Sequence, residues 1–337
     1  MNAFAADNAI TASGPGWRVQ LSESVAAAAD ARLPLAFEPL LALPPAHWAP
    51  ADEAAGPACC FHLEDQAAGL TVAQLFVELS AELSAGDLIQ PPQPAFGRLQ
   101  TAAGLPAAAL HHLLAAVETT LRERGQPRLR LLGQPFCYDP PAAARLAEVL
   151  RQRGYPVALA ALNYHLDLTQ PYAARLVPAA RQHLAECWRA GRHPEQEPPL
   201  LLPLAYEFMQ ACRQERGQQM PWSLPRLQAL FRQFPRAYSL FSVREPSGDW
   251  AALTVVVQVN KQVLWAGAPA SPLHLDAPGP AVLLYEGLHA YGQASGLRML
   301  DLGSSALAPG SDMAQFSLWP QLGGVAGLQL SWEKALV

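Results

Sequence analysis

Three polar residues near the C-terminus have types and spacing that could support chemistry. Asp301 lies in the alternating segment 299–302, and Ser304 and Ser305 follow where that segment ends. Ligands of open sheets bind beyond strand ends, and a carboxylate placed there can take a proton from an attacking amine. We therefore name Asp301, Ser304 and Ser305 as candidate catalytic residues. The alternative is that Asp301 hydrogen-bonds to neighbouring backbone.

A second candidate lies just upstream, at the start of a predicted helix. Gly279, Pro280, Ala281 and Val282 open a segment whose apolar residues recur at helical spacing, and proline suits the first helical position. The first N–H groups of a helix are unpaired and its dipole is positive there, so a helix start attracts anions. Asp276 opposes an anion nearby, and Pro280 lacks an N–H group. These four residues form our candidate cofactor-binding segment.

Other chemical patterns in the sequence are incomplete. Glu286 and His289 have the E-x-x-H spacing of metal ligands, but a single copy is insufficient. His111 and His112 are helical neighbours that point about 100° apart. No serine-hydrolase elbow, P-loop or dinucleotide fingerprint occurs. The cysteines are odd in number and show no CxxC spacing; they are Cys59, Cys60, Cys137, Cys187 and Cys212. We expect no metal.

Composition narrows the class of protein. The chain has 337 residues, of which 51% are hydrophobic and 15% charged, so it suits two domains and is too apolar to be disordered. A formal net charge of -5 argues against a protein whose main task is binding nucleic acid. The N-terminus lacks a positive segment followed by an apolar run, and no stretch of about 18 apolar residues occurs. We expect a cytoplasmic protein without a membrane span.

The elements that must position these residues are clearest in the second half. Residues 237–245 and 250–259 are β-branched and aromatic runs joined by a Pro-Ser-Gly-Asp turn, which predicts a hairpin. A helix is predicted over 281–295, and Gly296 ends it. The remaining predicted elements are a strand at 262–267, a strand at 298–302, a short helix at 311–319 and a last strand at 325–332.

The first half repeats this order more faintly. It is predicted to contain strands at 58–63 and from Leu70, a proline-rich loop at 91–94, a helix at 106–124, a strand at 128–132, a helix at 141–153 and an extended run at 157–168. Helices are predicted at 172–190, 201–216 and 224–234. We predict an N-terminal domain over 1–160 and a C-terminal domain over 161–337 that includes a helical arm, 172–234. Strands 128–132 and 298–302 should be equivalent.

This order of elements resembles that of the GNAT acyltransferase fold, and two such domains in tandem resemble the Fem-type arrangement. The segment 91–97, PPQPAFG, resembles the S-P-x-x-A-P-F-G segment of Fem-like bacterial proteins. The segment 300–305, LDLGSS, with Phe316 and the pair Gly323-Gly324, resembles their ending, although Ser317 replaces their lysine. The resemblance implies a mixed α/β fold of two GNAT-like domains, each with a central, mostly antiparallel sheet flanked by helices.

The resemblance also implies a function. GNAT enzymes hold acyl-CoA where the fourth strand and the strand after the long helix part, with its pyrophosphate at the helix start. The expected activity is transfer of an acyl or aminoacyl group from a thioester such as acetyl-CoA to a small amine or amino-acid-like acceptor. Of the two equivalent loops, 276–281 with Gly279 to Val282 is favoured over 101–106. The alternative is a catalytically reduced protein that binds a small molecule or a partner protein in the same cleft.

Overall fold

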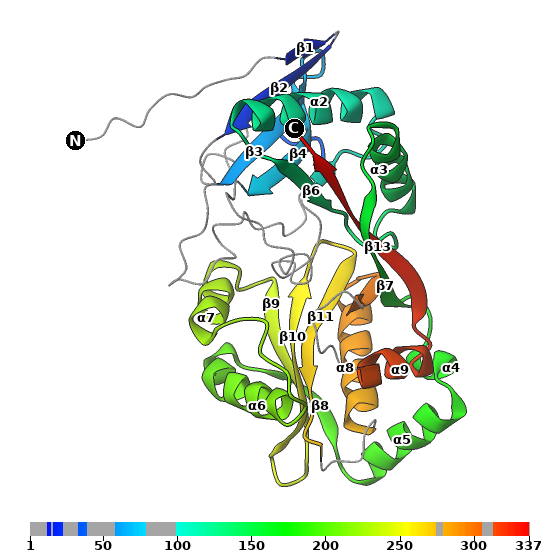
Figure 1. The fold of residues 1–337 in the computed structure, drawn as a ribbon. Helices are drawn as coiled ribbons and strands as arrows, with labels where there is room; N and C mark the ends of the chain where they lie inside the picture. The colour runs from blue at the N-terminus through cyan, green and yellow to red at the C-terminus, as the bar shows by residue number, and fades with distance from the viewer. Residues whose placement is uncertain are drawn as a thin grey trace, which may run out of the picture. The chain divides into compact units, whose positions relative to one another are not determined.

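The computed structural model describes residues 12–14, 16–22, 33–38, 58–78, 99–273, 279–304 and 313–336. The chain forms two units, one of Met1–Ala160 with Leu328–Val337 and one of Ala161–Gly327, and Figure 1 draws their elements. The chain passes between the units inside two long strands, β7 (Val157–Asp167) and β13 (Val325–Ala335). None of the helices within the described ranges is long and apolar enough to cross a membrane.

The first unit contains a five-stranded sheet in the order β1-β2-β3-β4-β5, all of whose neighbours pair antiparallel. Successive residues of a strand face opposite sides, and the apolar set, including Phe61, Leu63 and Leu75, is buried in a core with helix α2 (Ala107–Glu123). The strands are β1 (Ala12–Gly14), β2 (Trp17–Ser22), β3 (Ala58–Asp65), β4 (Leu70–Glu78) and β5 (Leu99–Thr101).

The last strand of the chain completes this unit. β6 (Arg128–Leu132) follows α2 and is followed by α3 (Pro140–Gln152). β6 pairs antiparallel with the end of β13, from Leu132 opposite Ser331 to Arg128 opposite Ala335. This pairing accounts for the placement of residues 328–337 in the first unit, whereas the sequence-based division leaves them in the C-terminal domain.

A buried carboxylate fastens the end of β13 to α2. Glu118 on α2 is 3% exposed and accepts hydrogen bonds from Lys334 Nζ at 2.9 Å, Arg153 Nε at 2.9 Å and the Tyr155 hydroxyl at 3.0 Å. Burial alone would raise the pKa of Glu118, but these hydrogen bonds and the charge of Arg153 bring it below the ordinary value. Glu118 is therefore ionised at neutral pH.

The second unit has a meander at the centre of its sheet, where the strand order is β7-β12-β11-β10-β9-β8. The predicted hairpin forms β9 (Tyr238–Arg244) and β10 (Trp250–Gln258), and β11 (Val263–Ala270) follows antiparallel. β12 (Met299–Ser304) runs parallel to β11 and antiparallel to β7. The edge strand β8 (His193–Glu197) pairs with β9. Its sequence, HPEQE, lacks the β-branched and aromatic residues that signal a strand, so it was not predicted.

The predicted helix 172–190 is two helices. Pro178 disfavours a helical conformation in the residue before it, and Leu176 and Val177 have ψ angles of 139° and 158°. The helices of this unit are α4 (Tyr172–Arg175), α5 (Pro178–Arg189), the 3-10 helix η3 (Pro199–Leu201), α6 (Leu202–Gln214), α7 (Leu224–Gln233), α8 (Gly279–Ala294) and α9 (Met313–Gln321).

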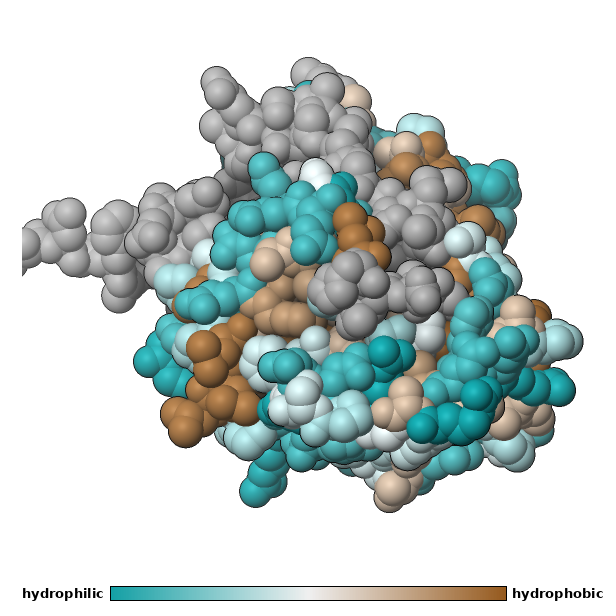
Figure 2. Space-filling model, turned by 90° about the horizontal axis from the view of Figure 1, so that it is seen from below, coloured by the Kyte–Doolittle hydropathy of each residue, from teal (hydrophilic) through white to brown (hydrophobic). Residues whose placement is uncertain are grey.

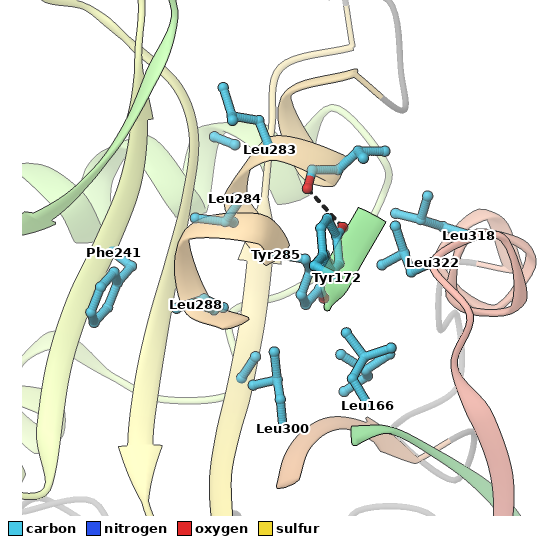
Figure 3. Packing of buried hydrophobic residues seen from close by; sticks show 14 of the residues in the cluster. Leu166, Tyr172, Phe241, Leu283, Leu284, Tyr285, Leu288, Leu300, Leu318 and Leu322 are labelled. Carbon is cyan, nitrogen blue, oxygen red and sulfur yellow. Dashed lines mark hydrogen bonds between the residues drawn. The ribbon is translucent and has the colours of Figure 1, made fainter. Parts of the chain in front are cut away.

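The core of the second unit surrounds α8. Figure 3 shows Leu284 and Leu288 of α8 among buried side chains that include Leu300 of β12. Leu302 belongs to the same core, as the alternation in this segment predicts. The mixed α/β architecture with mostly antiparallel sheets confirms the predicted fold class.

Some large apolar side chains stay at the surface of the second unit. Leu200 on η3 and Leu204 on α6 are 87% and 56% exposed. Figure 2 shows one face of the molecule, on which hydrophobic residues stand in groups among hydrophilic ones. Exposed apolar residues of this kind are ordinary on protein surfaces, so they indicate no site by themselves.

Candidate ligand pocket and strand-end residues

A pocket inside the first unit is lined by residues of β5 and by residues that follow β6. β5 and β6 flank α2 along the chain, yet they are not hydrogen-bonded neighbours, because β5 pairs with β4 and β6 with β13. The empty space between these residues, including the part that is open to solvent, is about 510 Å³. The pocket is lined by Leu99, Thr101, Leu105, Leu110, Gly133, Gln134, Phe136, Ala142, Ala143, Arg145, Leu146 and Trp332.

The pocket combines an apolar floor with a half-buried rim that contains both apolar and polar residues. Its buried lining is apolar and includes Trp332, which is 3% exposed. A Cβ atom at Gly133 would lie 2.8 Å from the Trp332 ring, so a glycine is needed for the ring to occupy this position. Thr101, Gln134 and Arg145 are half-buried and supply polar groups at the rim. Arg145 is the one charged residue in this lining.

Helix α2 begins at the edge of the pocket. Gly104 has a φ of +72°, in the left-handed region that favours glycine, and the lining residue Leu105 follows it. No side chain caps α2, and its first turn contains no acidic residue. Ala107 and Ala108, the first residues of the helix, are exposed. The positive end of the helix dipole is therefore accessible to an anion here.

Asp301, the candidate base, lies on β12 in the second unit and is 2% exposed. Its Oδ1 accepts a hydrogen bond from the backbone N–H of Gly303 at 2.8 Å and another from Asn163 Nδ2 at 2.8 Å. The β7 register is interrupted between Asp301 and Gly303, and Gly303 has a φ of +105°. Asp301 therefore holds a β-bulge, which is the backbone-anchoring role that the sequence left open.

Ser304 and Ser305 were predicted beside Asp301 at the strand end. Ser304 is 5% exposed and lies opposite Asn163 in the β7 register. Asn163 Nδ2 also donates to the carbonyl of Gly303 at 3.1 Å. The side-chain amide of Asn163 therefore donates hydrogen bonds to both Asp301 and Gly303 at the end of β12. Ser305 lies outside the described residues.

Two titratable side chains lie near Asp301, and both are neutral at pH 7. His165 is opposite Asp301 across the strands; burial lowers its pKa despite the opposing charge of Asp167. Burial and the charge of Asp301 raise the pKa of Tyr285 to about 12, although a hydrogen bond with Trp319 opposes the shift. Neither group is a cation that could pair with Asp301.

The predicted cofactor residues Gly279, Pro280, Ala281 and Val282 form the first turn of α8. All but the half-buried Ala281 are buried. The Tyr172 hydroxyl donates to the carbonyl of Val282 at 2.8 Å, the bond drawn dashed in Figure 3. This turn therefore packs into the core of the second unit. The loop with His274 and Asp276, and the motif 91–97, lie outside the described residues.

The metal-like patterns do not assemble into ligand sets. Within the described ranges, no group of three or more histidine, cysteine and acidic residues is placed to hold a metal ion. Glu286 accepts a hydrogen bond from Trp188 Nε1 at 2.8 Å, and the His289 ring packs against Tyr172. His111 bonds to Gln152.

The sequence analysis ranked the loop 101–106, which supplies Thr101 and Leu105 to the first-unit pocket, below 276–281, although a further signal for this pocket existed. Gly133 and Gln134 follow strand 128–132 as Gly303 and Ser304 follow strand 298–302, so the strand-end argument applies equally to both halves. The pocket also needs Trp332, which lies about 200 residues further along the chain. That contribution could not be read from local sequence.

Comparison with known proteins shows the fold. No protein-family model and no curated protein matches the sequence. Among solved structures, the crystal structure of FemX superposes with a TM-score of 0.62 at 9% identity, covering 82% of this chain and 88% of that one. The structure of L-PGS from Bacillus licheniformis has a TM-score of 0.50 at 12% identity, covering 78% and 81%. A tandem GNAT protein from the clavulanic acid biosynthesis pathway has a TM-score of 0.49 at 16% identity, covering 94% and 93%.

These matches confirm the predicted fold: the chain is similar in fold to FemX and to L-PGS. At identities of 9% and 12% they carry no residue-level assignment. The chemistry must therefore be argued from the residues of this chain.

Proposed function

We propose that the protein is an N-acyltransferase that moves an acyl or aminoacyl group from a thioester donor, such as acetyl-CoA, to a small amine or amino-acid-like acceptor. The observation that supports this most is the pocket of the first unit. It is lined by residues of β5 and by residues after β6, the two strands that flank α2 along the chain, and it lies beside an uncapped helix start in a chain with a Fem-like fold.

In this reaction the acceptor nitrogen attacks the thioester carbonyl carbon, so that a C–N bond forms, the C–S bond breaks and the thiol leaves. The ammonium proton must be lost to a base or an ordered water. The pocket is lined by no carboxylate, imidazole or thiol group. The proposal therefore assigns the proton to water and gives the pocket the task of holding the donor.

The pocket is a better donor site than the start of α8. CoA has an uncharged arm that ends in the thioester, and anionic phosphates; the proposal places the arm on the floor around Trp332 and the phosphates at the start of α2. At α8, Val282 is buried and its carbonyl is bound by Tyr172. We therefore keep Gly279 to Val282 as the second choice for the donor.

Asp301, Ser304 and Ser305 belong to the second choice, a donor at the start of α8, as its proposed reacting-site residues. The hydrogen bonds of Asp301 make it a positioning residue there, because they hold the strand end that carries Ser304. The five cysteines, all in the described ranges, form no disulfide, which supports the expected cytoplasmic location.

The proposal is tested with the full chain, acetyl-CoA and a panel of amines and amino acids, by measuring thiol release. A donor at 100 times its dissociation constant should also stabilise the fold by about 2.7 kcal/mol. Ala142→Leu, which fills the rim, should abolish both effects. Ala144→Leu is the matched control, because Ala144 is exposed on the same helix and is not a lining residue. Equal loss in both variants, or none in either, would remove the pocket as the donor site.

A binding module without catalysis is the second candidate. The absence of an acid or base among the lining side chains favours it. It predicts that acetyl-CoA stabilises the chain, that Ala142→Leu abolishes this stabilisation, and that no amine in the panel releases thiol.

A further inference from the structure

We propose that Arg145 is an anion clamp at the rim of the first-unit pocket, and that it holds a phosphate group of an amphipathic ligand. This inference rests on the proposed function, because it says which end of the thioester donor lies where. It adds a binding residue from α3, on a different element from the helix start to which the sequence analysis assigned the anion.

The guanidinium of Arg145 has no ion-pair partner within the described ranges of the protein. The closest carboxylate on α3, Glu148, bonds instead to Arg151 at 2.7 and 2.9 Å and to Gln152 at 2.7 Å. No hydrogen bond or ion pair joins Arg145 to another residue of the described ranges. A half-buried guanidinium beside an apolar cavity is thus left for a ligand.

The arrangement of the lining sets the orientation of that ligand. The buried lining is apolar, while Arg145, Thr101 and Gln134 are half-buried at the rim. A ligand with one apolar and one anionic end gains from both regions only if its anionic end lies at the rim. Its apolar end then lies on the floor, against Trp332 and Gly133.

Phosphate suits this rim better than carboxylate does. A phosphate presents three acceptor oxygens, and the rim offers the several N–H donors of a guanidinium together with the uncapped start of α2. The segment 101–106 before α2 contains no charged residue. Arg145 therefore supplies the positive charge that this helix start lacks.

The test uses calorimetric titration of the full chain at low salt with four probes: CoA, pantetheine, inorganic pyrophosphate and succinate. Arg145→Gln should weaken CoA and pyrophosphate at least tenfold and leave pantetheine, which has no phosphate, unchanged. The affinities of Arg145→Lys for CoA and pyrophosphate should lie between those of Arg145→Gln and those of the unaltered chain. Lysine keeps the positive charge but loses the forked N–H donors of the guanidinium. Arg232→Gln is the control, because Arg232 is an exposed arginine of α7 that does not line the pocket.

The outcomes separate this inference from the proposed function. If CoA binds Arg145→Gln as tightly as the unaltered chain, the clamp is wrong while the donor site stands. If pyrophosphate binding depends on Arg145 but CoA does not bind, the clamp stands and the acyl-CoA proposal fails. Binding of succinate in preference to pyrophosphate would overturn the phosphate assignment, and so would failure of both CoA and pyrophosphate to bind the unaltered chain.

Discussion

The two long helices of this protein begin with similar sequences in opposite surroundings. α2 follows Gly104-Leu105-Pro106, and α8 begins with Gly279-Pro280. The first residues of α2, Ala107 and Ala108, are exposed beside a pocket, whereas Val282 of α8 is buried and its carbonyl is bound by Tyr172. A helix start is an anion site only where its N–H groups can be reached, so the same local sequence is a candidate site in one unit and core in the other.

The strands that follow these helices differ in the same way. In the first unit, Gly133 donates its N–H to Leu330 at 2.9 Å and lines the pocket. In the second unit, Gly303 donates to Asp301 in a buried bulge. The strand end of the second unit is therefore part of the packed interior, through the hydrogen bond of Asp301. In the first unit, Gln134 at the strand end lies at the rim of the pocket.

The largest expected effect comes from adding a charge to each helix start. Val282→Asp buries an unpaired carboxylate and should cost about 3 to 5 kcal/mol of unfolding free energy. Ala108→Asp, in the first turn of α2, is exposed and should gain a few tenths of a kcal/mol from the helix dipole. Thermal melts of both variants check this. Two variants that melt alike would show that the two helix starts have the same environment.

Ala108→Asp also tests the pocket. Its carboxylate should repel the phosphates of CoA and weaken binding at least tenfold in calorimetry. Unchanged CoA affinity in this stable variant would place the donor elsewhere.

Glu118→Gln should have the next largest effect, because the first unit relies on this charge to hold the end of β13. Removing it leaves Arg153 and Lys334 without their buried partner and should cost about 3 kcal/mol at pH 7. Exposed Glu148→Gln serves as the control and should melt like the unaltered chain. A normal melt of Glu118→Gln would show that β13 is held by strand pairing alone.

The pH dependence of this contribution has a defined sign. The pKa of Glu118 is lowered in the folded chain, so its stabilisation is fully present above the ordinary glutamate value of about 4.3 and is lost as pH falls through the lowered one. The difference in melting temperature between the two chains should stay constant from pH 7 to about 5 and close at lower pH.

Asp301→Asn tests whether the second strand end serves packing. It weakens the hydrogen bonds to Gly303 and Asn163 and should cost about 2 kcal/mol, lowering the melting temperature by several degrees. Asp249→Asn, in the exposed hairpin turn, is the control. If Asp301→Asn melted normally but lost about 100-fold in turnover, Asp301 would be a catalytic base instead.

Local patterns in the sequence sufficed for the elements but not for the site. Gly125 and Gly296 follow their helices at φ angles of +70° and +71°, where glycine is favoured, and the stop at Gly296 was predicted. The role of Asp301 depends on Asn163, which lies 138 residues earlier. The pocket depends on Trp332, carried into the first unit by the last strand. Such long-range pairings leave no periodic signal in a single chain.

The smallest expected effect is that of Tyr172→Phe, which removes one hydroxyl from the start of α8. The carbonyl of Val282 loses a buried hydrogen bond, which costs about 1 kcal/mol. Tyr206→Phe removes the half-buried bond to the Trp222 carbonyl and should cost less, because water can replace the hydroxyl there. Since α8 begins inside the core, Tyr172→Phe should leave CoA affinity unchanged while lowering the melting temperature. A change in CoA affinity in this variant would show that the start of α8 contributes to the donor site, and the second unit would then replace the first as the proposed place of the donor.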